Sequence, residues 1–81
     1  MAPNEEHATT HELYLRDLGF LIRELAVESK QAAAESHSDF AIGYMLGFHR
    51  VVSLMQQQAE AFGIPLPDMA LDEFDPDSEL V

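Results

Sequence analysis

Two histidines and two glutamates have the spacing of metal ligands. His7 and His11 lie four residues apart, as two ligands on one helical face do. A zinc site needs a third or fourth protein ligand, and the chain has no cysteine to supply one. Glu24 and Glu28 can share one face of a predicted helix, where paired carboxylates hold Mg²⁺ or act as acid and base. Too few further carboxylates and histidines accompany them on a second helix, so we expect no metal, no cofactor and no enzymatic activity.

The other candidate side chains favour structural roles. His49 lies in the middle of the second predicted helix, where it can meet a carboxylate across a helical pair, for instance Glu24 or Glu28. We interpret it as an interfacial histidine, with a catalytic base as the alternative. The acids from Asp75 onward alternate like the start of a calcium loop, but they lack its central glycine and its late glutamate.

Composition and charge narrow the function classes. The 81 residues contain fifteen acids and four Lys or Arg, which gives a net charge of −11. Such a chain cannot displace the counterions of nucleic acid, and an anionic membrane surface repels it. No apolar run approaches the ~20 residues of a membrane span, and the polar N-terminal residues do not resemble a secretory signal. We therefore expect a cytoplasmic protein that attracts basic proteins, with an acidity that serves only solubility as the alternative.

The first predicted helix covers residues 9–36, after a lead over residues 1–8 that we expect to be disordered. Thr9 and Glu12 have the spacing of a capping box at its start. Gly19 costs a helix interior about 1 kcal/mol relative to alanine, so we interpret it as a point of close approach by a neighbouring backbone or ring. The predicted core stripe consists of Leu15, Leu18, Ile22, Leu25, Ser29 and Ala32.

The second predicted helix covers residues 39–62. Ser38 or Asp39 is its expected N-cap, and the sequence Gly63-Ile64-Pro65 is a strong stop signal. The short connection between the helices predicts an all-α, antiparallel helical hairpin. The predicted core stripe of this helix consists of Ala41, Met45, Phe48, Val52, Met55, Ala59 and Phe62.

The hairpin has more apolar surface than two helices bury between them. This predicts a homodimer, in which two hairpins form a four-helix bundle about a twofold axis. Gly43 and Gly47 permit close helix approach, and we favour a crossing within the chain for them over a crossing between copies. The predicted seam for a dimer or another partner consists of Phe20, Leu21, Tyr44, Gly47, Val51 and Leu54.

Residues 63–81 form an acidic tail that is too apolar for a disordered segment. We expect Ile64 to Phe74 to pack back across the hairpin, with a frayed end beyond them and a possible helical turn over residues 68–74 capped by Asp68. A basic stripe at Arg16, Arg23 and Lys30 is either a solvated helix face or an anchor for this tail. Carboxylates around apolar anchors favour binding to a basic protein. The predicted partner-binding residues are Asp68, Asp72, Glu73, Phe74, Asp75, Asp77 and Glu79.

The C-terminal half also resembles small bacterial immunity proteins that are found beside secreted toxins. The resemblance covers Asp39 to Leu80 and is carried by the helix end Gln-Ala-x-x-Phe-Gly-Ile and by the closing Asp-Pro-Asp. It implies a non-enzymatic protein that binds and blocks one toxin. The alternatives from the residues themselves are a homodimeric adaptor or regulatory subunit and an acidic mimic of DNA.

Overall fold

The computed structural model describes residues 9–81, and the lead predicted over residues 1–8 lies outside this range. The described chain is all-α and has no strand. Two long helices, α2 (Thr10–Ser36) and α3 (Asp39–Phe62), are followed by the 3₁₀ turn η1 (Leu66–Met69) and the short helix α4 (Pro76–Glu79). Over residues 9–81, none of the helices combines the length and the apolarity that crossing a membrane requires.

Both ends of α2 are capped by the chain itself. At the start, Glu12 N–H donates to the Thr9 hydroxyl at 3.1 Å, and Thr9 N–H donates to the Glu12 carboxylate at 2.7 Å. This reciprocal pair is the predicted capping box. At the other end, His37 takes a left-handed conformation with φ 54°, and its N–H donates to Ala33 O. The left-handed residue ends α2 and turns the chain toward α3.

The ends of α3 also follow from local sequence. The Ser38 hydroxyl accepts a hydrogen bond from Ala41 N–H at 3.1 Å, so Ser38 is the N-cap. Gly63 has φ 71°, which glycine adopts without the steric cost of a Cβ. Gly63 N–H donates to Glu60 O, and Ile64 N–H donates to Ala59 O at 2.8 Å. These are the two hydrogen bonds of a Schellman motif.

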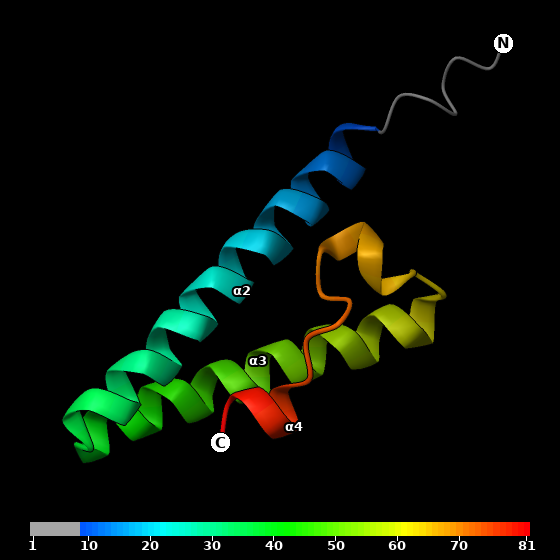
Figure 1. Ribbon diagram of the computed structural model, residues 1–81. Coiled ribbons are helices and arrows are strands. Elements are labelled where there is room, and N and C mark those ends of the chain that lie inside the picture. Colours follow the sequence, from blue (N-terminus) through cyan, green and yellow to red (C-terminus); the bar gives the residue numbers. More distant parts are fainter. Residues whose placement is uncertain (1–8) are drawn as a thin grey trace, which may run out of the picture.

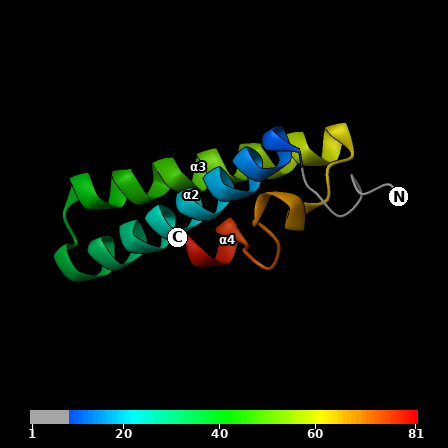
Figure 2. The same cartoon turned by 90° about the horizontal axis from the view of Figure 1, so that it is seen from above.

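The two long helices are antiparallel and are joined by a short linker. The distance between them increases away from this linker (Figure 1). At the open end η1 lies between them and contacts both. Helix α4 packs against α3 nearer to the linker. A view at right angles shows η1 and α4 on the same side of the helix pair (Figure 2). Residues 64–74 therefore cover one side of the hairpin, as the sequence predicts. The frayed end predicted beyond them is wrong, because α4 packs on α3 and Leu80 is fully buried.

The core forms where the hairpin meets the tail. Its large side chains come mainly from the tail, while the helices supply mostly alanines. Its buried apolar residues are Ala26, Ala33, Ala41, Met45, Val52, Ala59, Met69, Leu71, Phe74 and Leu80.

Three residues of the predicted core stripes are exposed, namely Leu25, Ala32 and Phe62. Phe62 is 76% exposed, because six alternating steps of four and three residues fall about 60° short of six full helical turns. Leu25 is 45% exposed, whereas its neighbour Ala26 is fully buried. The tail packs on the side of α2 that carries Ala26, which shifts the buried stripe away from Leu25.

The glycines of the two helices differ in their surroundings. A Cβ on Gly19 would lie 1.8 Å from Met69 O, so the backbone of η1 touches α2 at this point. This confirms the close approach predicted for Gly19. By contrast, nothing lies within 4 Å of a Cβ on Gly43 or Gly47. The crossing within the chain that we favoured for this pair is therefore wrong, because α2 packs on a different side of α3.

The tail turns differ from the predicted turn over residues 68–74. Asp68 lies inside η1 and caps nothing, because Pro65 occupies the N-cap position without a side-chain hydrogen bond. The second turn, α4, begins after Asp75, whose carboxylate accepts Asp77 N–H at 3.0 Å. Pro67 at the second position of η1 and Pro76 at the first position of α4 favour the backbone conformation with which each turn begins.

Candidate functional site

The basic stripe of α2 holds the tail by its backbone. The Arg23 guanidinium donates through Nη1 to Ala70 O and to Asp72 O, each at 3.3 Å. Its central carbon also lies 5.4 Å from the centroid of the Phe74 ring, within the range of a cation–π contact. The Lys30 ammonium donates to Val81 O. The stripe therefore anchors the tail through backbone oxygens and not through the carboxylates of its acidic side chains.

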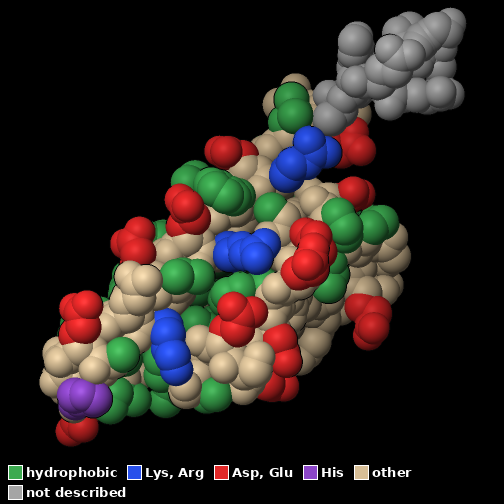
Figure 3. Space-filling view, in the orientation of Figure 1, with side chains coloured by type: hydrophobic (Ala, Val, Ile, Leu, Met, Phe, Trp, Pro, Cys, Tyr) green, Lys and Arg blue, Asp and Glu red, His purple; other side chains and the backbone are tan. Residues whose placement is uncertain are grey.

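Figure 3 shows the tail side of the molecule. Basic side chains lie in a row along α2, with acidic side chains on both sides of the row. Arg16 belongs to the stripe, but no hydrogen bond from it to the tail is found. It lies near the capping box, where hydrogen bonds from the Thr9 backbone and side chain, and the Arg16 charge to a smaller extent, hold the pKa of Glu12 below its usual value.

Helix α3 holds the tail from the other side. Gln56 donates through Nε2 to Phe74 O at 2.7 Å and to Leu71 O at 3.2 Å. We did not predict a role for Gln56 from the sequence, although it lies one helical turn after the buried Val52 and therefore on the buried face of α3. A polar side chain on an apolar stripe needs a hydrogen-bond partner.

His49 pairs with the tail and not with α2. Its Nε2 lies 2.9 Å from Asp77 Oδ1. The predicted partners, Glu24 and Glu28, are wrong because the helical phase of His49 turns it toward the tail. Among residues 9–81 this is the one contact within 4.0 Å between a basic and an acidic side chain.

The predicted partner-binding acids divide into two groups. Asp75, Asp77 and Glu79 have structural contacts: Asp75 caps α4, Asp77 pairs with His49, and the Glu79 carboxylate accepts Asp75 N–H at 3.0 Å. The second group has no hydrogen bond or ion pair from its carboxylates to the rest of the described chain, and it consists of Asp68, Asp72 and Glu73. These acids are therefore available to a partner without loss of an internal contact.

The apolar tail residues are not surface anchors. Phe74 is 4% exposed, because its ring packs beneath Arg23 in the core. Met69 and Leu71 are buried as well. Phe74, predicted as a contact residue, is thus part of the chain's own fold, and the tail presents mainly carboxylates.

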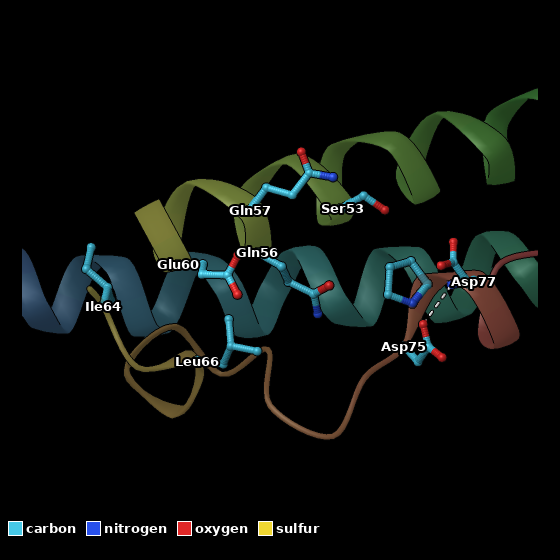
Figure 4. Close-up of a pocket in the computed structure, with 9 residues that line it drawn as sticks. Ser53, Gln56, Gln57, Glu60, Ile64, Leu66, Asp75 and Asp77 are labelled. Atoms are coloured by element: carbon cyan, nitrogen blue, oxygen red, sulfur yellow. Dashed lines mark hydrogen bonds between the residues drawn. The ribbon is translucent and has the colours of Figure 1, made fainter. Parts of the chain in front are cut away.

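An open hollow of about 420 Å³ lies between α3 and the tail. Figure 4 shows Gln56 and Glu60 on α3 pointing toward the tail, with Ser53 and Gln57 on the same helix beside them. The dashed line marks the hydrogen bond from Asp77 N–H to Asp75. Within residues 9–81, no group of three or more His, Cys, Asp or Glu side chains is placed to hold a metal ion. Glu60, Asp75 and Asp77 make this hollow an acidic feature of the surface.

A second surface lies on the side of the hairpin opposite the tail. The tail contacts Gly19, Arg23 and Lys30 on α2. On each helix, several large apolar side chains are rotated by a quarter turn or more about the helix axis from the residues that contact the tail. These side chains point away from the tail. We call this surface the apolar face, and its exposed residues are Tyr14, Leu21, Leu25, Phe40, Tyr44, Val51, Leu54 and Phe62.

The predicted seam is divided between two sides of the molecule. Leu21, Tyr44, Val51 and Leu54 belong to the apolar face, and Gly47 lies among them on α3. Phe20 does not, because it lines a hollow with Arg16 and Ala70 at the edge of the tail. Adjacent residues of a helix differ by about 100° in direction, which separates Phe20 from Leu21.

Comparisons with protein-family models, with curated proteins and with solved structures found no match for this chain. The resemblance to immunity proteins therefore stays a prediction.

Proposed function

We propose that the protein is a non-enzymatic binding protein that uses the exposed carboxylates of its tail to bind a basic protein partner. An inhibitor or immunity-type role, in which the partner is a toxin, agrees with the resemblance of the C-terminal half. Asp68, Asp72 and Glu73 are the acids with which the tail contacts this partner.

The observation that carries the proposal is the lack of charge compensation on the tail. The cations nearest to it, Arg23 and Lys30, donate to backbone oxygens. The whole chain has a net charge of −11. Within residues 9–81, the only acidic side chain within 4.0 Å of a basic side chain is Asp77, which pairs with His49. Carboxylates without internal partners lose no hydrogen bond when a Lys or Arg of another protein binds them. A field of one sign also accelerates association with a protein of the opposite sign.

The experiment is affinity capture from the native cell with a charge-neutralised variant. The tail variant carries Asp68→Asn, Asp72→Asn and Glu73→Gln. The control variant carries Asp17→Asn, Glu24→Gln and Glu35→Gln on α2, so that the net charge changes equally. We expect the wild type and the control to retain the same basic protein and the tail variant to lose it. The purified wild-type protein should inhibit the activity of that partner.

Two results would contradict the proposal. One is that no basic protein is enriched by the wild type over a column without protein. The other is that both variants retain the partner equally, which would show that the acids of the tail have no particular role. Circular dichroism of both variants checks that the helices are intact.

A further inference from the structure

We infer that a second copy of this chain covers the apolar face, with α2 of each copy packed against α3 of the other. The inference is independent of the proposed function, because the apolar face and the tail acids lie on opposite sides of the hairpin. Its occupant is identified by the size of the face, by its lack of charge and by the charges at its edges.

The size of the face fits an interface. Its eight residues are between 44% and 81% exposed. With typical side-chain areas of up to 150–250 Å² for the aromatic residues, they expose roughly 700–1,000 Å². The largest apolar patch of a typical monomer is about 300–600 Å², and a standard interface buries about 800 Å² per partner. Pairing two copies through this face therefore buries the area of a stable dimer.

The face contains no charged side chain from residues 9–81. Helical phase places small, apolar and uncharged polar residues between its two edges, among them Ala32, Gln58 and Gly47. A chain with a net charge of −11 repels its own copy at almost any other surface. Gly47 is open, with nothing within 4 Å of an added Cβ, and permits a partner helix to approach closely.

The charges at the edges select one arrangement. The outer edge of α2 carries Asp17, Glu24, Glu28 and Glu35, so pairing α2 with α2 would place two acidic rows together. The outer edge of α3 instead carries one base, Arg50, one turn from Leu54, and one acid, Asp39, beside the linker. A twofold axis parallel to the helices pairs α2 with α3 and avoids this repulsion.

The register of this pairing follows from distances along the helices. Arg50 lies eleven residues after the start of α3 at Asp39, and Leu25 lies eleven residues before the end of α2 at Ser36. Both are thus about 17 Å from the linker. In the twofold pairing, Arg50 of one copy comes level with Glu24 and Glu28 of the other, which flank Leu25.

The test is the mass in solution, measured by light scattering at micromolar concentration. We expect the wild type to have twice the chain mass of 9.1 kDa. The variant Leu21→Glu with Val51→Glu should have the monomer mass, because it places carboxylates inside an apolar interface. The matched control is Phe20→Glu with Val27→Glu, which changes equally exposed residues outside the face and should remain a dimer. Helical circular dichroism shows that each variant is folded.

Cysteine cross-linking tests the arrangement. The chain has no cysteine, so single variants report without background. Mixed Leu25→Cys and Val51→Cys proteins should form a disulfide-linked heterodimer on oxidation, because the paired register brings these positions together. A monomeric wild type, a dimer that survives Leu21→Glu with Val51→Glu, or preferential linkage of Leu25→Cys to itself would each overturn the inference.

Discussion

Replacing Gly19 with alanine tests how the tail is seated on the hairpin. On its own, α2 would gain from this change, because alanine is about 1 kcal/mol more favourable than glycine in a helix interior. In the folded protein, the new Cβ would lie 1.8 Å from Met69 O and 2.8 Å from Met69 C. These are backbone atoms that cannot move aside by rotation of a side chain, so η1 has to shift.

The magnitude follows from these opposing effects. Overpacking a close contact costs about 1–3 kcal/mol, and a backbone clash this short belongs at the upper end. After subtraction of the gain in helix propensity, we expect Gly19→Ala to lower the free energy of unfolding by about 1–2 kcal/mol. For a domain of this size, that corresponds to a fall in Tm of roughly 4–16 °C.

The assay is urea unfolding followed by circular dichroism, with Gly43→Ala as the matched control. Nothing lies within 4 Å of a Cβ on Gly43, so this variant should be more stable by about 0.5–1 kcal/mol. Amide exchange should accelerate after Gly19→Ala around η1 and much less near the linker between α2 and α3. If Gly19→Ala stabilises the protein as much as Gly43→Ala does, the close approach of Met69 to α2 is refuted.

Two further predictions concern the tail anchor and the start of α2. Arg23→Gln should destabilise the protein by about 1 kcal/mol and raise amide exchange in residues 70–74, because it removes the hydrogen bonds to Ala70 O and Asp72 O; Arg16→Gln is the control, and equal effects of both variants would argue against the anchor. The lowered pKa of Glu12 means that its ionised form stabilises the folded protein above its usual pKa of 4.5, and this contribution is lost as the pH falls through the lower, folded-state value. Helicity should therefore fall more on acidification in the wild type than in Glu12→Gln, measured by circular dichroism against pH, and parallel titrations would contradict this.

The helix ends were predictable from sequence because their signals are local. Thr9 with Glu12, Ser38, and Gly63 before Pro65 each act within four residues, so their caps form as the sequence predicts. The burial of Met69 and Leu71 was predictable from composition, since an acidic segment with large apolar residues gains by packing.

Contacts between distant segments were not predictable in the same way. The partner of His49 depends on the side from which the tail returns, and sequence periodicity contains no information on that side. The same holds for Leu25 and Ala26. Leu25 was predicted to be buried, but the position of the tail buries Ala26 instead and leaves Leu25 exposed. Gly43 and Gly47 show the limit of a spacing argument, because small residues four apart permit a close crossing without specifying which helix makes it.

The anchoring of the tail by Arg23 and Lys30 through backbone oxygens has a consequence for sequence change. A backbone oxygen is common to every amino acid, so the hydrogen bonds at Ala70, Asp72 and Val81 do not depend on which side chain these positions carry. Substitutions at Asp72 that alter the charge of the surface therefore leave the scaffold intact. Binding preference can diverge among descendants of this chain while the architecture beneath it is inherited unchanged.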